Sequence, residues 1–290
     1  NISEQIRDIK KGANIIVGTP GRTIDLMGRK VLKFDTVSTV ILDEADEMLN
    51  MGFIDDVEEI IKKTGSQKRM LLFSATMPEK IISIAKKYMR NYEMLGVKKE
   101  QLTTNLTDQI YFEVSHADKF DALCRIIDFE HEFYGLIFCR TKIDVDSVAN
   151  KLMERGYDAD ALHGDIAQNQ REIILNKFRK QRINILVATD VAARGIDIHN
   201  LTHVINYSLP QDPEAYVHRI GTTGRAGKEG TAITFVTPDE YRRLIFIKKF
   251  AKTDIRKEKL PKIEDVINQK KARIKTQIAN IIKTEDTDGY

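Results

Sequence analysis

The stretch VILDEADEML at residues 40–49 places four carboxylates directly after an apolar run, and apolar residues then return. The short run rich in Val, Ile and Leu is typical of a parallel strand buried on both faces. One aspartate after such a strand can cap the following helix. A cap alone does not account for Asp43, Glu44 and Asp46 together, because clustered carboxylates repel one another unless a cation or basic group lies among them. Magnesium on a nucleotide is such a cation, and a neighbouring acid can orient or deprotonate an attacking water.

The composition limits the class of protein. The 290 residues suggest two domains, and 42% hydrophobic residues are enough to build real cores. The 46 basic and 43 acidic residues nearly cancel to a net charge of +3, which excludes a histone-like polycation. Cys124 and Cys139 form no CxxC pair, so the sequence predicts no disulfide framework, no zinc site and a reducing, cytoplasmic location. The apolar runs are far shorter than the ~20 residues of a membrane span, so we expect no membrane partner.

Short apolar runs alternate with longer amphipathic stretches, which predicts an α/β fold with parallel sheets and right-handed crossovers. The strands are expected at 14–19, 39–42, 70–73, 110–114, 135–139, 184–189, 203–207 and 231–236. The helices are expected at 55–63, 79–90, 118–131, 142–155, 168–180 and 238–250. Several of the strands end in small and polar residues, and ligands of open α/β sheets bind beyond the carboxyl ends of strands.

Two regions interrupt this alternation. Residues 96–108 are expected to form a linker between a first domain at 1–95 and a second at 109–250. Residues 251–290 form a Lys-rich extension with apolar residues at 263, 267, 274, 278 and 281, which make one helical stripe. The stripe fits a helix packed on its own domain, the contact of a homodimer, or a basic arm that contacts RNA.

A basic complement to the acidic cluster lies far along the chain, in YVHRIGTTGRAGKEG at 216–230. Arg219 and Arg225 stand among glycines, which permits close approach of the backbone to phosphate with guanidinium groups within reach. A glycine-rich turn with solvated arginines is the alternative.

Six motifs occur in one order: TPGR at 19–22, DEAD at 43–46, SAT at 74–76, QNQR at 168–171, ATDVAARGIDI at 188–198 and HRIGTTGR at 218–225. In this order they resemble the DEAD-box ATP-dependent RNA helicases, and are most similar to the bacterial cold-shock type. The resemblance covers residues 1 to about 250 and implies two RecA-like parallel-sheet domains, followed here by a C-terminal helical extension. It implies ATP and Mg²⁺ as cofactors, and RNA as a partner contacted mainly through its backbone.

The resemblance also implies residue roles. Asp43 would hold Mg²⁺ largely through water, and Glu44 would activate the hydrolytic water. Asp46 would connect to Ser74, Thr76 and the basic motif, coupling nucleotide state to domain closure. His218 and Arg219 would support the closed interface, Asp197 would contact the ribose of ATP, and Arg225 would reach the terminal phosphate. RNA phosphates would be bound by Thr19, Gly21, Arg22, Arg140, Gln168, Arg171, Thr189 and Gly195.

Two departures from the family pattern qualify this reading. The motif GxxxxGK[ST] is absent, and only about 95 residues precede the linker, so we expect an N-terminally truncated first domain that is poorly stable, and a chain without ATPase activity of its own. Thr222 stands where the family usually has arginine, which predicts impaired hydrolysis unless the position tolerates variation or was changed deliberately.

Other readings of the sequence stay open. A non-catalytic RNA-binding or assembly module fits the surviving RNA motifs, and a related DNA helicase is disfavoured by the DEAD and SAT motifs together. The scattered histidines are expected to be structural, although His163 in LHGD resembles a family position near RNA.

Overall fold

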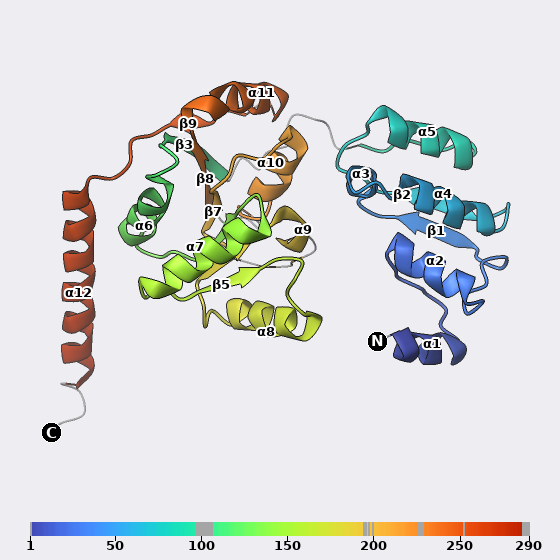
Figure 1. Cartoon of the computed structure of the whole chain (residues 1–290), viewed down its shortest axis with the longest axis horizontal. Coiled ribbons are helices and arrows are strands. Elements are labelled where there is room, and N and C mark those ends of the chain that lie inside the picture. The colour runs from blue at the N-terminus through green and yellow to red at the C-terminus, as the bar shows by residue number, and fades with distance from the viewer. Residues whose placement is uncertain are drawn as a thin grey trace. The chain divides into compact units, whose positions relative to one another are not determined.

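The computed structural model describes residues 2–96, 107–193, 196, 198, 200–224, 229–251 and 253–285. The chain divides into two compact units, Asn1–Val97 and Lys98–Tyr290 (Figure 1). Both are built from parallel strands with helices between them, as the alternation of apolar and amphipathic segments predicts. The predicted α/β class with parallel sheets is therefore confirmed.

The first unit has a small sheet of two parallel strands, β1 (Thr39–Leu42) and β2 (Arg69–Leu72). Its helices are α1 (Ile2–Lys10), α2 (Pro20–Gly28), α3 (Ala45–Asn50), α4 (Ile54–Lys63) and α5 (Glu79–Tyr88). The core of this unit gathers buried side chains from β1, β2 and the helices α3, α4 and α5, with Ile61 and Ile81 fully buried. The sheet thus holds the ends of β1 and β2 side by side, where the acidic cluster and the SAT motif begin.

The strand predicted at 14–19 does not form, and this prediction was wrong. The segment leads into α2 without strand geometry, and Ile15 and Val17 are 84% and 95% exposed. Its apolar residues have the composition of a buried strand, but the two described strands of this unit pair only with each other. An apolar run needs a neighbouring strand before it can pair and be buried.

The second unit is built on a parallel sheet of seven strands in the order β5-β6-β4-β7-β8-β3-β9. These are β3 (Thr107–Glu113), β4 (Gly135–Phe138), β5 (Ala159–Leu162), β6 (Ile185–Ala188), β7 (His203–Asn206), β8 (Gly230–Val236) and β9 (Arg256–Lys257). The helices are α6 (Lys119–Phe129), α7 (Lys142–Glu154), α8 (Gln168–Arg179), α9 (Asp190–Ala193), α10 (Pro213–Ile220) and α11 (Tyr241–Ala251), with a short 3₁₀ helix η2 (Pro238–Glu240) before α11.

The core of the second unit follows the alternation of side chains along each strand. Ile137 and Ile205 face the layer that contains α6 and α7. Leu136 and Val204, one residue earlier on the same strands, face α8 and α9, and the corresponding residues of β8 meet α10 and α11. Because successive side chains of a strand point to opposite faces, these strands are apolar on both sides and carry helices on both sides.

Two strands of this sheet were missed. The sequence of β5, ADAL, carries Asp160 at its centre, and β9 consists of Arg256 and Lys257 only. Neither is an apolar run, because both lie at the edges of the sheet, where one side of the strand faces solvent. Edge strands therefore give the weakest signal in the sequence.

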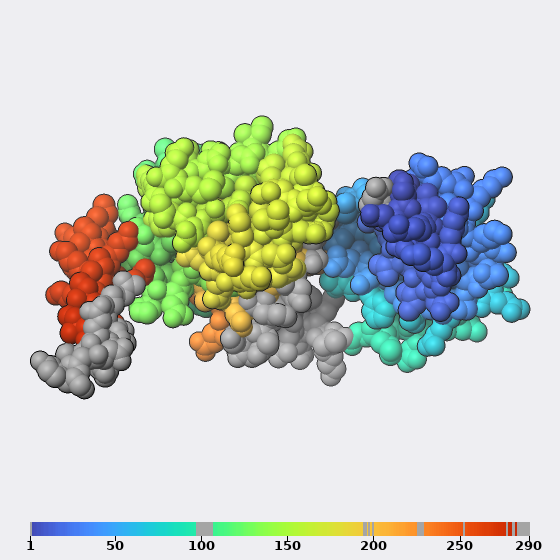
Figure 2. Space-filling model, turned by 90° about the horizontal axis from the view of Figure 1, so that it is seen from below, coloured from blue at the N-terminus to red at the C-terminus, as the bar shows by residue number. Residues whose placement is uncertain are grey.

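In the C-terminal extension, β9 is followed by one long helix, α12 (Ile263–Glu285), which lies against α6 (Figure 2). Val266 is buried, Lys270 Nζ lies 2.6 Å from Asp128 Oδ2, and Arg273 donates to the backbone oxygen of Glu130. The predicted apolar stripe is on another side of the helix: Ile263, Ile267, Ile274 and Ile278 are 45–61% exposed. Ionic and polar contacts, with one buried valine, hold α12 on its own unit. Nowhere in the described part of the chain is a helix both long and apolar enough to span a bilayer.

Candidate functional site

The acidic cluster lies in the turn between β1 and α3. Asp43 and Glu44 are both exposed, and the Asp43 carboxylate accepts a hydrogen bond of 3.0 Å from the backbone N–H of Glu44. Glu44 has a left-handed backbone with φ 52° and ψ 47°. A left-handed non-glycine residue typically costs about 1–3 kcal/mol and is found preferentially at functional sites. The turn thus presents two adjacent carboxylates to solvent beyond the carboxyl end of a strand.

Asp46, two residues further, is turned inward and is only 3% exposed. Its Oδ2 accepts hydrogen bonds from the backbone N–H (2.8 Å) and the hydroxyl (2.9 Å) of Thr76. The Ser74 hydroxyl oxygen accepts from the backbone N–H of Asp46 at 3.1 Å, and the same hydroxyl donates to the backbone oxygen of Thr76 at 2.6 Å. The three predicted residues therefore form one network that joins the end of β2 to the first turn of α3.

The carboxylates of the cluster do not form a metal cage made by protein alone. Among the described residues, no group of three or more His, Cys, Asp or Glu side chains could hold a metal ion. Asp46 is occupied by hydrogen bonds, which leaves Asp43 and Glu44 directed to solvent. This arrangement suits Mg²⁺, which prefers one or two carboxylates together with waters and the phosphates of its nucleotide.

The TPGR motif lies at the start of α2. Thr19 caps the helix with an extended backbone (φ −78°, ψ 152°), and Pro20 occupies the first helical turn, where its missing N–H costs nothing. Thr19, Gly21 and Arg22 are exposed, and a Cβ added at Gly21 would meet no atom within 4 Å. Arg22 Nη1 donates to Gln5 Oε1 at 3.2 Å. The motif therefore presents an open helix N-terminus and a guanidinium, a combination that suits a phosphate group.

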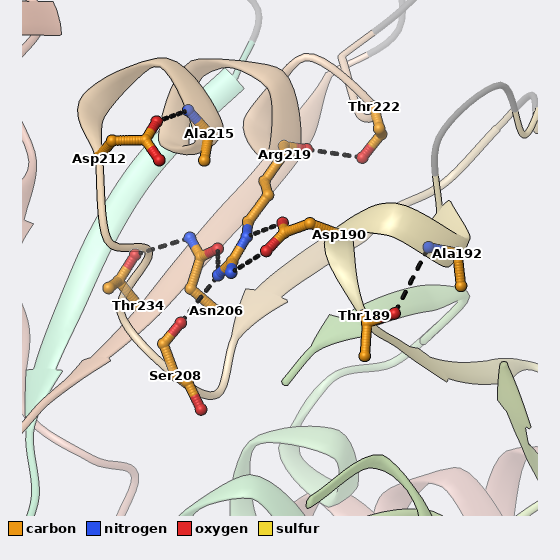
Figure 3. Close-up of polar contacts among 10 residues, drawn as sticks. All are labelled: Thr189, Asp190, Ala192, Asn206, Ser208, Asp212, Ala215, Arg219, Thr222 and Thr234. Carbon is orange, nitrogen blue, oxygen red and sulfur yellow. Dashed lines mark hydrogen bonds and ion pairs between the residues drawn. The ribbon is translucent and has the colours of Figure 1, made fainter. Parts of the chain in front are cut away.

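In the second unit, Arg219 is the centre of a buried polar network (Figure 3). It extends from α10 to Asp190 at the start of α9, and the two side chains form a bidentate pair with distances of 2.6 and 2.8 Å. Arg219 Nη1 also donates to Asn206 Oδ1 (2.9 Å) and to the backbone oxygen of Ser208 (2.8 Å). Its guanidinium lies 4.9 Å from the centre of the Phe138 ring.

This network connects α10 to the carboxyl ends of β6 and β7. Arg219 is 3% exposed, and its guanidinium is hydrogen-bonded within the unit. Its predicted role in supporting a closed interface stays a prediction. His218, its neighbour, is partly buried. Asp190, Asn206 and Ser208 were not proposed as site residues, although Asp190 lies in the ATDVAARGIDI motif, directly after the strand predicted at 184–189.

The turn after α10 is held close to that network. Thr222 donates from its hydroxyl to the backbone oxygen of Arg219 (2.6 Å), and the buried Thr223 donates to the backbone oxygen of Leu201 (2.6 Å). Gly224 has φ 65°, a left-handed conformation that favours glycine. Thr222 thus hydrogen-bonds a backbone oxygen at the C-terminal end of α10 and brings no positive charge to this turn.

The predicted RNA-contacting residues of the second unit are found at strand ends and helix starts. Arg140 is exposed beyond β4, and its guanidinium donates to the Gln211 side-chain oxygen in the amide orientation that satisfies both groups. Gln168 begins α8 and donates to Glu172 Oε1 at 3.0 Å. Arg171 donates to the backbone oxygen of Ala192, and the Thr189 hydroxyl oxygen accepts from the backbone N–H of Ala192 at 3.4 Å.

Three predicted site residues, Gly195, Asp197 and Arg225, lie outside the described residues. His163 is buried, and its Nε2 lies 2.9 Å from Asp146 Oδ1. Both cysteines are buried, and burial raises the pKa of the Cys139 thiol well above its usual range. Cys139 is therefore protonated at neutral pH and is not a candidate nucleophile.

Comparisons with known proteins agree with this arrangement. The family model "DEAD/DEAH box helicase" matches residues 1–84, and "Helicase conserved C-terminal domain" matches residues 118–227. A DEAD-box ATP-dependent RNA helicase CshA of Geobacillus kaustophilus is 46% identical over 290 residues, covering 100% of this chain and 62% of the relative. The ATP-dependent RNA helicase CshA of Listeria monocytogenes is 51% identical over 247 residues, covering 84% of this chain and 48% of the relative.

The chain also matches solved structures, among them one of a DEAD box protein. The chain matches S. cerevisiae Dbp5 bound to RNA and ADP BeF3 with a TM-score of 0.80 and 33% identity, covering 90% of this chain and 69% of that one. It matches a DEAD box protein of Methanococcus jannaschii with a TM-score of 0.52 and 49% identity, covering 89% of this chain and 69% of that one. The chain spans about half to three-fifths of the length of the curated relatives quoted above. It belongs to the DEAD-box family of ATP-dependent RNA helicases, and its fold is of the RecA-like type found in that family.

Proposed function

We propose that the protein to which this chain belongs is an ATP-dependent RNA helicase that unwinds or remodels short RNA duplexes. Two RecA-like domains would close on a nucleotide and on the RNA backbone. One observation carries the proposal: Asp43 and Glu44 are exposed in a strained turn while Asp46 next to them is fixed to Ser74 and Thr76. A turn that only capped a helix would not need two outward carboxylates.

The division of roles in the first unit follows from that geometry. Asp43 would hold Mg²⁺ through water, and Mg²⁺ would supply charge neutralisation on the phosphates. Glu44 would orient and deprotonate the attacking water. Asp46, Ser74 and Thr76 would couple nucleotide state to domain closure, because their network joins the end of β2 to the first turn of α3, directly after the turn that carries Asp43 and Glu44.

The second unit would complete the site. We propose that Asp197 contacts the ribose and Arg225 the terminal phosphate, as in the family pattern. His218 would support domain closure, while Arg219 would position the turn at 221–224 from within the unit, since its guanidinium is occupied by Asp190 and Asn206.

RNA binding would involve both units. In the first unit, Thr19, Gly21 and Arg22 would contact RNA phosphates. The exposed N-terminus of α2, where these residues lie, supports this proposal. The second unit would contribute Arg140, Gln168, Arg171, Thr189 and Gly195. Because these contacts would go to the backbone, weak sequence preference and strong salt dependence are expected.

The proposed domain limits are 1–95 for the first RecA-like domain, 96–108 for a linker, 109–250 for the second domain and 251–290 for the helical extension. The exposed isoleucines of α12 support a homodimer contact through this helix. Sedimentation of the chain and of an Ile274→Lys/Ile278→Lys variant would test it: a dimer should dissociate in the variant, and a monomer in both would reject the contact.

A polypeptide of these 290 residues is not expected to hydrolyse ATP alone, because its sequence contains no GxxxxGK[ST] loop to cradle the phosphates. Phosphate release should stay at background with RNA present. A chimera in which the phosphate-loop segment of a CshA relative precedes Asn1 should hydrolyse ATP, and Glu44→Gln should abolish that activity. Hydrolysis by the chimera that survives Glu44→Gln would reject the proposed role of Glu44.

In the same chimera, Thr222→Arg should increase the hydrolysis rate, because an arginine near the terminal phosphate stabilises charge that builds up in the transition state. Thr223→Arg is not a suitable control because Thr223 is buried. Thr222→Lys, which adds charge without the planar fork, separates a charge effect from an arginine-specific one. An unchanged rate in both variants would show that position 222 does not limit hydrolysis.

The second candidate is a non-catalytic RNA-binding or assembly module. It is favoured by the absence of the phosphate loop in a sequence that retains RNA motifs in both units. RNA affinity that is identical with and without an ATP analogue in the chimera would favour this candidate over the helicase.

A further inference from the structure

Helix α11 has an apolar face that the fold does not use. Its core face, with Leu244, Ile247 and Ala251, packs in the cluster that also contains α10 residues. On the other sides, Tyr241 (44%), Ile245 (47%), Phe246 (58%) and Phe250 (42%) are largely exposed. Single exposed apolar residues are ordinary, but four on one helix of eleven residues make a patch that is a candidate interaction site.

The patch has an ordered layout. At 3.6 residues per turn, residues four apart lie above one another, so Tyr241 and Ile245 form one pair and Phe246 and Phe250 form another. Arg242 and Lys249, which are seven residues apart, lie between the two pairs. The exposed half of the helix is therefore apolar on both flanks and cationic along its middle.

A cavity adjoins the patch at Tyr241. Tyr241 lines a cavity of about 290 Å³ together with Glu113, Thr237 and Pro238, at the carboxyl end of β3 and the start of α11. A cavity beside an exposed aromatic residue can take an apolar side chain of a binding partner as an anchor. The surface thus has both an extended contact area and one pocket.

The charges on α11 have one sign. The helix contains Arg242, Arg243, Lys248 and Lys249 and no acidic residue. Arg243 lies 3.9 Å from Glu240, and Lys248 lies 3.4 Å from Asp254. Within the described ranges, Arg242 and Lys249 form no ion pair. The two cations in the middle of the patch are therefore exposed and available to carboxylates of a binding partner.

We propose that α11 and the cavity beside Tyr241 form a docking surface for an acidic peptide segment of a partner protein, one with aromatic or aliphatic anchor residues. The anchors would cover the two apolar pairs and enter the cavity, and the carboxylates would meet Arg242 and Lys249. Such a segment matches the surface in both hydrophobicity and charge.

Two other occupants fit less well. A second copy of the chain that packed α11 on α11 would bring Arg242 and Lys249 of both copies together without an acid on either helix. RNA would find no cation for its phosphates in the cavity, which is lined by Glu113, Thr237, Pro238 and Tyr241.

The test begins with a selection. Random peptides displayed on phage are selected on the 290-residue chain and counter-selected on its Phe246→Ala/Phe250→Ala variant. Both substituted side chains are exposed, so the variant is expected to fold, which circular dichroism checks. The surviving peptides should be enriched in Asp and Glu and carry Phe, Trp or Leu anchors. No surviving peptide, or survivors without an acidic excess, would overturn the proposal.

The second step measures one enriched peptide, labelled with fluorescein, by anisotropy. Phe246→Ala/Phe250→Ala should weaken its binding at least about tenfold, as loss of aromatic anchors does elsewhere. Arg242→Glu/Lys249→Glu should weaken it, and a peptide with Lys in place of its acids should regain affinity for that variant. Ile173→Ala on α8, which removes an apolar residue 49% exposed, is the matched control and should change nothing.

The RNA alternative is measured on the same variants with labelled oligouridylate. Under the proposal, RNA affinity changes little with Phe246→Ala/Phe250→Ala. Loss of RNA binding in this variant, with peptide binding unaffected, would assign the surface to RNA and reject the peptide proposal.

Discussion

At the scale of single residues, the charged side chains of the candidate site are either exposed to solvent or buried and hydrogen-bonded. Asp43 and Glu44 are open to solvent, whereas Asp46 and Arg219 are buried and satisfied by several partners. A buried charge is tolerated only where hydrogen bonds and an opposite charge replace water. We infer that the buried residues Asp46 and Arg219 fix the strand ends and helix starts near which the exposed carboxylates lie.

Asp46→Ala should destabilise the first unit by about 1–3 kcal/mol, because the N–H and hydroxyl of Thr76 lose their acceptor in a partly buried position. Urea unfolding followed by circular dichroism measures this. Asp43→Ala removes an exposed carboxylate and should stay within about 0.5 kcal/mol. Equal effects of the two substitutions would contradict the structural role of Asp46.

Arg219→Ala should cost about 1–3 kcal/mol in the second unit, because Asn206 Oδ1 and the backbone oxygen of Ser208 lose their donor, while Asp190, whose side chain is 36% exposed, can be solvated. Arg219→Lys keeps the charge but not the bidentate geometry, so only part of the loss should be recovered. Thermal unfolding distinguishes these variants from Arg242→Ala, an exposed control. A mild effect of Arg219→Ala would mean that the network does not hold the strand ends together.

Residue-level prediction from the sequence succeeded where a motif names the residues. Asp46, Ser74 and Thr76 were expected to interact, and they do. The partners of Arg219 were not foreseen, because Asp190 follows β6 while Asn206 and Ser208 lie at the end of β7, and only the folded sheet brings these two strand ends together. Single residues separated by long stretches carry no local signal of such a contact.

At the scale of helices and strands, an ion pair joins the two amphipathic helices that help to build the core of the first unit. Glu58 of α4 accepts from Lys87 Nζ (2.7 Å) and from the Tyr88 hydroxyl (2.9 Å) of α5. The hydrogen bond from Lys87, followed by that from Tyr88, holds the pKa of Glu58 below its usual range. A carboxyl group with a lowered pKa in the folded state adds stability above its unfolded pKa and loses it as the pH falls through the folded value.

Glu58→Gln should therefore lower the stability of the first unit at neutral pH, and the difference from the parent chain should shrink in acid, as the pH falls through the lowered pKa of the Glu58 carboxyl group. Urea unfolding between neutral and acidic pH measures the difference. Glu59→Gln, on the same helix and exposed, is the matched control. A difference that persists unchanged in acid would show that the charge of Glu58 is not its source.

The elements themselves were predicted well where they are buried on both sides. The central strands of the second unit and the helices with a clear apolar stripe were expected, whereas β5 and β9 at the edges were not. The opposite error occurred at 14–19, where a strongly apolar run remains exposed and unpaired. Apolar composition predicts which segments can be buried, but burial also requires a neighbour to pair with.

At the scale of the whole molecule, the family assignment accounts for a chain of modest net charge that has, in both units, motifs we propose to contact RNA. A nucleotide that binds residues of both units would make RNA affinity depend on the nucleotide, since a ligand shifts an equilibrium only through unequal affinity for its states. Coupling of this kind typically amounts to about 1–3 kcal/mol, or roughly 5–150-fold in affinity.

The most direct test of this account is the affinity of the phosphate-loop chimera for a labelled RNA, measured with and without Mg²⁺ and a non-hydrolysable ATP analogue. We predict an increase of roughly tenfold or more with the analogue. Glu44→Gln should keep this increase while hydrolysis is lost. The same RNA affinity in the presence and absence of the analogue, in a chimera shown to bind the nucleotide, would contradict the account.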